Sequence, residues 1–591
     1  AYEIGSGLVG SEMCIRDRQW KVGRTMQKQV GIGKQDFATL RESQCFYIDK
    51  TDFIRQWWNY RDDVTLITRP RRFGKTLNMS MLNCFFSNKY ADRGDLFEGL
   101  DIWKDSGYRQ IQGTYPVLYL SFASVKADNV SDAKKQVKSR IVSLYQDFEY
   151  LLENEKLMES EKMAYRHILT EMAEMDDITA CDSLNYLCRY LEHAYEKKVI
   201  ILLDEYDTPM QEAYVHGYWA EFTTFVRSLF NATFKTNPYL ERAMMTGITR
   251  VSKESIFSDL NNLRVVTTTS DLYADCFGFT EKEVFASLDE FGMGDKKDVV
   301  KQWYDGFIFG GHRDIYNPWS ITNYLKEKKL RPYWADTSSN GLAGKLIRTA
   351  SPEIKEYMED LLNGQAVTVN FDEQMVFEQL DYNENAIWSL LLASGYLKAE
   401  EVEYRGITLK PWYQLRITNL ETVSMFDDMF RGWFEASEAG YSSFVKALMQ
   451  GDLEAMNYYM NKVSLATFSH FDVGGETNES LEPERFYHGF VLGLMAERAE
   501  CYQIRSNRES GFGRYDVMMI PKNREKDPAI IIEFKVCSRV KKETLEDAVQ
   551  EALKQIVDKK YDAELVALGV PQERIRHYGF AFAGKNVLIG A

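Results

Sequence analysis

Three adjacent residues, Gly74, Lys75 and Thr76, have types and a spacing that suit phosphate chemistry. A short apolar run at 64–67 precedes them and predicts a buried strand, and apolar residues then recur at helical spacing over 77–86. In a strand, loop and helix of this order, the first N–H groups of the helix and its dipole favour an anion. Lys75 could reach the terminal phosphates of ATP, and the Thr76 hydroxyl could ligate Mg²⁺. The stretch therefore predicts a phosphate-binding P-loop that includes Gly74.

The loop departs from the usual pattern G-x-x-x-x-G-K-[ST] at its first position. Arg69 stands where the pattern has glycine, and Pro70 follows it with a fixed φ, so the loop must turn without its first glycine. Arg72 lies in the same loop and is a further candidate for contact with the nucleotide. Taken alone, the stretch is also compatible with a basic loop before an ordinary helix, so a second motif has to decide.

The second motif is an apolar run at 199–203 that ends in Asp204 and Glu205. Such a run is typical of a strand buried on both faces of a parallel sheet, and ligands bind at the carboxyl ends of such strands. This is a Walker B pattern, in which we expect Asp204 to hold Mg²⁺ and Glu205 to polarise the attacking water. The alternative is a buried strand that ends in a solvated acidic turn, and the Gly-Lys-Thr sequence upstream makes it much less favoured.

Two further predicted strands support a P-loop domain. The strand at 115–122 lies between the two motifs in the sequence, which favours the subclass with an inserted strand and a catalytic glutamate. The strand at 240–249 ends in polar residues. P-loop ATPases place a polar residue that contacts the γ-phosphate on a strand beside the Walker B strand. Thr246, Thr249 and Arg250 are the candidates for that contact. Solvated residues at a strand end are an equally favoured alternative.

A second set of residues suited to catalysis lies nearer the carboxyl end. Asp516 stands near the start of a predicted strand at 513–520, and Glu533 and Lys535 lie in another at 527–536. Alternate residues of a strand share a face, and a charge in a buried strand is costly unless it is paired or bound to a metal. Two carboxylates and a lysine suit Mg²⁺ and an attacking water. An ion pair at a strand end is the alternative.

The composition bounds the class of protein. The chain has 591 residues, of which 45% are apolar and 27% are charged, which is enough for about three or four globular domains. Its net charge of −16 argues against a surface that binds polyanions everywhere. Locally, however, 501–542 holds ten Lys or Arg and five Asp or Glu, which supports a polyanion partner there. A solvated face is the alternative for that segment.

Other sequence features bear on location and on the chain start. No run approaches the ~18 apolar residues of a membrane span, so no membrane partner is expected. The eight cysteines are scattered without a C-x-x-C pair, which favours a reduced, cytoplasmic chain. Residues 8–17 can be back-translated into a sequence that resembles a transposase adapter used in DNA library preparation. We therefore expect residues 1–18 to be adapter-derived and the natural start to lie near Met26, unless the natural N-terminus is lost.

Four segments together resemble the bacterial AAA-ATPase-like family. They are Phe46-x-x-Asp-Lys-Thr51, Arg69-Pro-Arg-Arg-Phe-Gly-Lys-Thr76, Leu203-Asp-Glu-Tyr-Asp-x-Pro209 and Thr246-Gly-Ile-Thr-Arg-Val-Ser252. The resemblance spans about 31–262. Arginine in place of the first glycine is usual in that family, so the resemblance implies an ATP-binding domain despite Arg69. Members usually carry a C-terminal PD-(D/E)XK nuclease-like domain.

The C-terminal segment is similar to PD-(D/E)XK nucleases. This resemblance implies that Asp516 and Glu533 bind the metal and that Lys535 is the catalytic lysine. Glu484 matches an acid on the N-terminal helix of such domains. Gln555 matches a polar position on the helix after the catalytic strands, which often faces the site.

These observations predict an α/β protein with three regions. We expect a P-loop ATPase domain with a parallel sheet at 26–275, a connecting region at 276–465 and an α/β restriction-endonuclease-like domain at 466–591. In the connecting region, an apolar helix at 385–396 precedes a predicted hairpin, which is compatible with a winged helix. Winged helices bind DNA or act as rigid spacers, and the spacer is favoured here.

The leading functional hypothesis is an ATPase that gates Mg²⁺-dependent hydrolysis of DNA by the C-terminal domain. The alternative is an ATP-dependent switch whose C-terminal domain binds nucleic acid or a protein without cutting. A homo-oligomer or a protein partner is compatible with both. The choice between DNA and RNA, the sequence specificity and the biological process stay open at this point.

Overall fold

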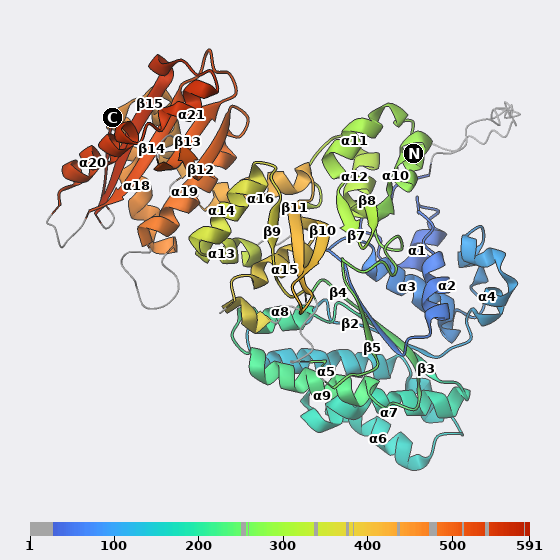
Figure 1. The fold of residues 1–591 in the computed structure, drawn as a ribbon. Coiled ribbons are helices and arrows are strands. Elements are labelled where there is room, and N and C mark those ends of the chain that lie inside the picture. Colours follow the sequence, from blue (N-terminus) through green and yellow to red (C-terminus); the bar gives the residue numbers. More distant parts are fainter. Residues whose placement is uncertain are drawn as a thin grey trace, which may run out of the picture.

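The structure is a computed structural model that describes residues 28–249, 256–257, 259–335, 341–373, 377–381, 383–433, 438–471, 482–510, 513–537, 543–583 and 586–591. The N-terminal sheet with its helices lies at one end of the molecule and the C-terminal sheet at the other, with the connecting elements between them (Figure 1). The expected adapter segment lies outside the described residues. Within the described residues, no helix is both long and apolar enough to cross a membrane.

The N-terminal domain is built on five parallel strands in the order β2-β3-β4-β1-β5. Their bounds are β1 (Val64–Thr68), β2 (Val117–Ser121), β3 (Val199–Asp204), β4 (Leu240–Gly247) and β5 (Leu263–Val266). All residues of β1 and β3 are buried, as the two apolar runs predict. The inserted-strand subclass is confirmed, but the strand that separates β1 from β3 in space is β4. The strand that lies between the two motifs in the sequence, β2, is at the edge of the sheet.

Helices cover both faces of this sheet (Figure 1). Alternate residues of β3 enter different apolar cores, because successive side chains of a strand point to opposite faces. Ile200 and Leu202 belong to a core shared with α1 (Phe37–Glu42), α2 (Asp52–Tyr60), α3 (Lys75–Phe86) and α4 (Ser106–Ile111). Ile201 and Leu203 belong to a core shared with α5 (Val130–Gln146), α6 (Glu159–Glu171), α7 (Asp177–Tyr195), α8 (Thr208–Val215) and α9 (Trp219–Phe234).

A small unit follows β5, and we call it the α10–α12 unit. It has a three-stranded antiparallel sheet in the order β6-β8-β7 and three helices. Its elements are β6 (Phe279–Thr280), α10 (Glu281–Glu290), α11 (Lys297–Tyr304), β7 (Phe307–Phe309), β8 (His312–Tyr316) and α12 (Pro318–Glu327). Phe46, from the N-terminal segment, is part of its apolar core, so the unit packs against the N-terminal domain.

The predicted helix and hairpin are present in the connecting region. The helix is α15 (Ala386–Ala393), and Gly395 follows it with a φ of 83°. The hairpin is formed by β10 (Leu397–Arg405) and β11 (Lys410–Ile417), and β9 (Val367–Val369) adds a third antiparallel strand. The region also contains α13 (Gly341–Thr349), α14 (Pro352–Leu362), α16 (Leu420–Gly432) and α17 (Glu438–Gln450), of which α14 packs against β9 and β11. The order of these elements is α14, β9, α15 and then the hairpin.

The C-terminal domain has a mixed five-stranded sheet in the order β12-β13-β14-β15-β16, in which only β14 and β15 pair in parallel. Its elements are α18 (Leu453–Phe471), α19 (Glu482–Arg498), β12 (Tyr502–Ser510), β13 (Gly513–Pro521), β14 (Ala529–Val536), α20 (Leu545–Asp558), α21 (Asp562–Ala567), β15 (Ile575–Ala583) and β16 (Asn586–Gly590). The predicted domain boundary at 465/466 falls inside α18.

Helix α18 covers the edge of this sheet with two asparagine side chains. Asn457 donates to the carbonyl of Ile589 at 2.8 Å and accepts from its N–H at 2.8 Å. Asn461 forms the same pair of bonds with Val587, at 2.7 and 2.9 Å. The amides replace a neighbouring strand, so α18 belongs to the C-terminal sheet and protects its edge strand.

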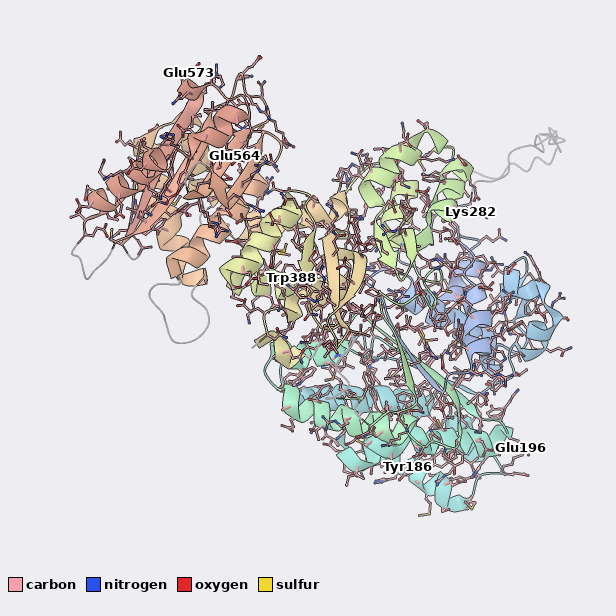
Figure 2. The ribbon with its side chains drawn as sticks, in the orientation of Figure 1. Tyr186, Glu196, Lys282, Trp388, Glu564 and Glu573 are labelled. Atoms are coloured by element: carbon pink, nitrogen blue, oxygen red, sulfur yellow. The ribbon has the colours of Figure 1, made fainter. Side chains whose placement is uncertain are left out.

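One apolar core runs from the P-loop through the connecting region to the C-terminal sheet. It includes Phe73 beside the P-loop, Trp388 of α15, Phe490 of α19 and Phe580 of β15. Trp388 is fully buried, and Figure 2 places it between the two large sheets. The connecting region therefore joins the two end domains through continuous packing.

Candidate functional sites

The P-loop connects the carboxyl end of β1 to the first turn of α3. Gly74 caps the helix with a φ of 80°, a left-handed conformation that glycine adopts without strain. Arg72 also has a positive φ, of 66°. The turn thus depends on two left-handed residues, and it directs the first N–H groups of α3 toward the space above the sheet.

Arg69 shows how the loop forms without its first glycine. Its side chain is fully buried and donates to the carbonyls of Thr68 at 3.1 Å, Leu272 at 3.3 Å and Thr267. Its guanidinium lies 4.5 Å from the ring centroid of Phe309, in the α10–α12 unit. Burial lowers the pKa of Arg69 to about 10, so the side chain stays charged at neutral pH. Arg69 is a structural cation that joins β1 to the chain after β5.

Lys75 lies inside the loop. Its ammonium group donates to the carbonyls of Arg69 and Pro70, both at 2.8 Å. Burial lowers the pKa of Lys75 to about 8, and the nearby carboxylates of Asp207, Glu205 and Asp204 oppose that shift. A buried cation next to acids and at a helix N-terminus suits an anionic ligand.

Asp204 and Glu205 lie at the carboxyl end of β3, as predicted. The Thr246 hydroxyl of β4 donates to the buried carboxylate of Asp204, which orients it. Glu205 has a positive φ of 51°, so the chain turns sharply between the two acids. Burial, and next the charge of Asp204, raise the pKa of Glu205. A partly desolvated carboxylate with a raised pKa has the character of a general base.

Asp207, the second aspartate of the segment Leu203–Pro209, is a residue of this site to which the sequence analysis gave no role. Its carboxylate accepts from the N–H groups of Ile248 and Thr249, at 2.9 and 2.8 Å, and from the Thr249 hydroxyl at 2.9 Å. A Cβ on Gly247 would lie 2.7 Å from a carboxylate oxygen of Asp207, so glycine is required for this close approach. The acid holds the loop after β4 against the Walker B turn. Arg250 lies outside the described residues.

A cavity of about 600 Å³ lies above the carboxyl ends of the strands. The predicted nucleotide ligands Arg72, Gly74, Lys75, Thr76 and Glu205 all line it. Asp204, Thr246 and Thr249 are not among its lining residues, although Glu205 and Ile248 beside them are. Its other walls include 31–35 near the N-terminus, α12, and 341–342 at the start of α13.

The α10–α12 unit and the chain just after it hold the P-loop from outside. The Arg72 guanidinium lies 4.3 Å from the ring centroid of Trp319. The carbonyl of Arg71 accepts from Asn317 at 3.3 Å and from the indole N–H of Trp334 at 3.1 Å. The phosphate-binding loop is therefore shaped by residues about 250 positions away in the sequence.

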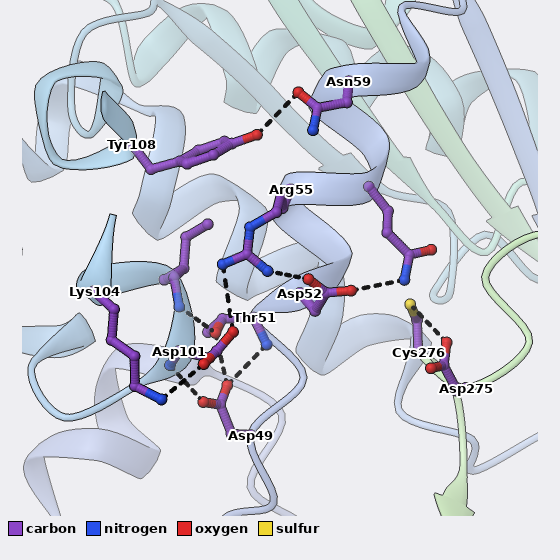
Figure 3. A network of polar contacts seen from close by, with 12 residues as sticks. Asp49, Thr51, Asp52, Arg55, Asn59, Asp101, Lys104, Tyr108, Asp275 and Cys276 are labelled. Atoms are coloured by element: carbon purple, nitrogen blue, oxygen red, sulfur yellow. Dashed lines mark hydrogen bonds and ion pairs between the residues drawn. The ribbon is translucent and has the colours of Figure 1, made fainter. Parts of the chain in front are cut away.

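The segment Phe46–Thr51 has a structural part in this arrangement. Lys50 donates to both carboxylate oxygens of Glu283, at 2.8 and 2.7 Å, and to the carbonyl of Asp275 at 2.7 Å. Asp49 accepts from the N–H groups of Thr51 at 2.9 Å and Asp101 at 2.7 Å. Figure 3 shows the bonds of Asp49, and with those of Lys50 they fasten the N-terminal segment to the chain before α4 and to α10.

The nuclease-like residues meet on the C-terminal sheet. β13 and β14 are antiparallel, and Val517 pairs with Ile532, so Asp516 and Glu533 occupy the next facing positions. The N–H of Phe534 donates to a carboxylate oxygen of Asp516 at 2.7 Å. The structure thus brings the two predicted metal ligands together on neighbouring strands.

Gln555 of α20 joins the lysine to one of these carboxylates. The Lys535 ammonium donates to the amide oxygen of Gln555 at 2.6 Å and to Glu533 at 3.3 Å. The Gln555 amide donates to the same Glu533 oxygen and, at 3.1 Å, to the hydroxyl of Tyr561. Gln555 therefore holds Lys535 and Glu533 in one arrangement, in agreement with a polar position that faces the site.

Gly579 allows α20 to pack closely against β15. It lies opposite Glu533 on β15. A Cβ at Gly579 would be 2.8 Å from the carbonyl oxygen of Val549 and 3.0 Å from the Cβ of Ala552, both on α20. Because backbone atoms cannot give way, any side chain at this position would push the helix away from the strand.

The Glu533 carboxylate fits a cation ligand. The residue is 2% exposed, and burial and then the charge of Asp516 raise its pKa to about 8. One of its oxygens is buried without a hydrogen-bond partner among the described residues. Such an oxygen is costly unless a ligand binds it. Two adjacent carboxylates form the hard oxygen donor set that Mg²⁺ prefers.

Glu484 is the one nuclease-site candidate that the structure does not place. Its backbone lies in the first turn of α19, but its side chain is outside the described residues. The helix itself packs against α14, α16 and β12.

Comparison with known proteins assigns both ends of the chain. Residues 31–257 match a family described as Predicted AAA-ATPase, and residues 482–591 match the PD-(D/E)XK nuclease superfamily. The chain therefore contains an AAA-ATPase-like domain followed by a domain of the PD-(D/E)XK nuclease superfamily, as the motifs predicted.

A curated protein is similar along nearly the whole chain. It is described as "Uncharacterized protein in vnfD 5'region" of Azotobacter chroococcum mcd 1 and is 27% identical over 558 residues. The match covers 92% of this chain and 95% of that protein, so the connecting region occurs with both end domains in it as well.

Proposed function

We propose that this chain is a cytoplasmic ATPase that gates Mg²⁺-dependent hydrolysis of phosphodiester bonds in DNA. The observation that carries the proposal is the C-terminal site, where the partnerless oxygen of Glu533 lies beside Asp516 and within the network of Lys535 and Gln555. The seven described cysteines are free thiols, which supports a reducing compartment.

In the nuclease site, Asp516 and Glu533 hold the cation. A divalent cation bound there supplies a Lewis acid and lowers the pKa of an attacking water. Lys535 orients that water and offsets negative charge that develops on the phosphate. Gln555 fixes the position of Lys535 from the opposite side. Arg514, two positions before Asp516 on β13, adds positive charge for a phosphate backbone, whereas Arg505 and Arg508 are paired with Glu564 and Asp360.

In the nucleotide site, Lys75 and the first N–H groups of α3 bind the phosphates of ATP, and Arg72 adds a contact from the loop. Thr76 and Asp204 hold Mg²⁺. Glu205 polarises the attacking water, which its raised pKa supports. Thr249 and Arg250 complete the phosphate end of the site in this proposal.

Contacts between the two sites support gating. The Glu421 carboxylate of α16 is fully buried and accepts from the N–H of Trp334 at 2.6 Å and from the Ser320 hydroxyl at 2.8 Å. Trp334 is the residue whose indole holds the P-loop carbonyl of Arg71. At the other end of α16, Arg431 donates to the carbonyl of Ala496 in α19 at 2.6 Å. A change at the P-loop can thus reach the nuclease domain through one helix.

The test measures ATP turnover and nucleic-acid cleavage by the chain from Met26 onward. Wild type, Lys75→Ala and Lys535→Ala are compared with duplex DNA, single-stranded DNA and RNA, each with Mg²⁺ or Mn²⁺. We expect ATP turnover that rises with DNA and is lost in Lys75→Ala, and ATP-dependent cleavage that is lost in Lys535→Ala.

Cleavage of none of these substrates by an active ATPase would contradict the nuclease proposal. It would favour the alternative, an ATP-dependent switch whose C-terminal domain binds nucleic acid or a protein partner without cutting. Tight ATP binding without turnover would favour that switch as well, and a homo-oligomer would then be sought by light scattering with and without ATP.

A further inference from the structure

The basic side chains around the nucleotide cavity have different surroundings. Six of them line it among the described residues: Lys34, Lys50, Arg71, Arg72, Lys75 and Lys126. Arg71, Arg72 and Lys75 belong to the P-loop itself. Lys34 donates to the Ser43 hydroxyl at 2.7 Å, and Lys50 is paired with Glu283. Lys126 is the one that lies on the β2 side of the cavity.

Lys126 follows the strand next to the Walker B strand. Ser121, the last residue of β2, pairs with Asp204, and the N–H of Phe122 donates to the Asp204 carbonyl at 3.0 Å. The chain needs only four more residues to reach Lys126. Lys126, Glu205 and Gln211 of α8 all line the cavity. The backbone that leads to Lys126 thus starts beside Asp204 at the end of β3.

The backbone of Lys126 is held in place although its side chain is exposed. Gln136 of α5 accepts from its N–H and donates to its carbonyl, both at 2.8 Å. The next carbonyl, of Ala127, accepts from the Tyr218 hydroxyl at 2.7 Å. The ammonium group forms no ion pair with any described carboxylate. A fixed backbone thus carries, at the wall of the cavity, a cation that has no ion pair among the described residues.

We propose that Lys126 contacts the γ-phosphate of ATP in the same chain and is a catalytic residue of its hydrolysis. The inference rests on the proposed ATPase function and adds a further cation to the phosphate end of that site. In that reaction a water oxygen bonds to the γ-phosphorus, and the bond to the bridging oxygen breaks with its electron pair leaving on ADP. The water proton passes to Glu205 and then to solvent. Lys126 offsets the negative charge that builds up on the transferring group.

The proposed position of the Lys126 ammonium group predicts that it contributes to the binding of ATP and not to that of ADP. Because ADP lacks the γ-phosphate, removal of the Lys126 ammonium should leave ADP binding almost unchanged. ATP binding and the rate of hydrolysis should both fall, since the charge to be stabilised is on the group that ADP has lost.

The test uses the full chain and four variants: Lys126→Ala, Lys126→Arg, Gln136→Ala and Lys135→Ala. Lys135 is the matched control, because it is exposed on the same helix as Gln136, pairs with Glu174 at 2.8 Å and does not line the nucleotide cavity. Steady-state kinetics give kcat and KM, and titration gives the Kd for ADP and for ATPγS.

For Lys126→Ala we expect kcat to fall at least ~10-fold, as for loss of one charge-stabilising donor, with the Kd for ADP changed less than twofold. Lys126→Arg should recover part of the rate, and Gln136→Ala should lower it less than Lys126→Ala. Lys135→Ala should match wild type.

An unchanged kcat in Lys126→Ala would overturn the assignment, and so would an equal loss of ADP and ATPγS affinity. If wild type binds nucleotide without turnover, affinity alone is compared. An equal loss of ATPγS and ADP affinity in Lys126→Ala would then overturn the assignment. A wild-type protein that binds neither nucleotide would instead contradict the ATPase function itself. Lys75→Ala would then bind nucleotide no differently from wild type.

Discussion

The guanidinium of Arg72 lies over the indole ring of Trp319, 4.3 Å from its centroid. Arg72 is in the P-loop, whereas Trp319 lies in α12, beyond residue 257, where the match to the AAA-ATPase-like family ends. The phosphate-binding loop is thus completed by a part of the chain outside the ATPase family match. An arginine held in this way is positioned before a nucleotide arrives, which reduces the ordering cost of binding.

Substitution of Trp319 by alanine tests this pairing. A cation–π contact is worth about 0.5–2 kcal/mol, so we expect the Kd for ATP to rise about 2- to 30-fold in Trp319→Ala. Trp319→Phe should retain most of the affinity. Trp412→Ala, which removes a similar contact with Arg405 on the β10–β11 hairpin, is the control. Equal ATP affinities in wild type and Trp319→Ala would show that the stack does not position Arg72.

Arg69→Gly restores the usual P-loop pattern, yet we expect it to damage the protein. The substitution leaves the carbonyls of Thr267 and Leu272 without their buried donor and opens a void beneath Phe309. Loss of such bonds costs on the order of 3 kcal/mol of the free energy of unfolding. Differential scanning fluorimetry should show a lower midpoint, and ADP binding should weaken.

The control for Arg69 is Arg264→Ala, which removes a half-exposed arginine of β5 with one ion pair to Asp62. That variant should unfold within a degree or two of wild type. A fully stable Arg69→Gly protein that binds ATP more tightly would show instead that Arg69 obstructs the loop.

Lys535→Ala should abolish cleavage and leave the affinity for nucleic acid largely intact. Lys535 orients water in the proposed mechanism, and one lysine among several cations contributes little to total phosphate binding. Gln555→Ala should lower the cleavage rate less, because Lys535 keeps its contact with Glu533. Gel cleavage and fluorescence anisotropy measure the two properties. The control is Lys554→Ala, which changes an exposed neighbour on α20 and should behave as wild type. Loss of DNA affinity in Lys535→Ala would instead indicate that Lys535 binds DNA.

Asp305 predicts a pH dependence of stability. Burial, and next the Asp314 carboxyl, raise the pKa of Asp305 to about 7. Because this folded-state pKa lies above the unfolded value of about 3.9, its contribution is present at low pH and is lost as pH rises from about 4 to 7. Asp305→Asn should therefore gain stability over wild type through this window and keep a constant gain above it.

Urea unfolding at several pH values between 4.5 and 8.5 measures this gain. Asp298→Asn, an exposed neighbour on α11, is the control and should show no such growth. A stability difference that is the same at all these pH values would contradict the raised pKa of Asp305.

Much of both sites could be predicted from the sequence, because their residues lie next to regular elements. The apolar runs before Gly74 and Asp204 fixed two strand ends, and the parallel sheet brought those ends to one edge. The strand periodicity likewise put Glu533 and Lys535 on one face. Local pattern was sufficient where the chemistry depends on neighbours in the sequence.

Residues whose roles depend on distant partners could not be predicted. Arg69 departs from the P-loop sequence pattern, and its structural role depends on carbonyls that follow β5. Asp207 belongs to the segment Leu203–Pro209, but its role could not be predicted from it, because its partners are N–H groups about 41 residues away. Gly579 matters only because α20 crosses it. The 465/466 boundary was placed inside α18, since nothing local shows that Asn457 and Asn461 bind β16.

The continuous core from Phe73 to Phe580 has a consequence for the order in which the protein is made. A ribosome releases the N-terminal region first, and domains generally fold as they emerge. The C-terminal sheet is completed last, by β16, against apolar surfaces that the connecting region already provides. Its two carboxylates are therefore brought together only in a molecule that already has a P-loop.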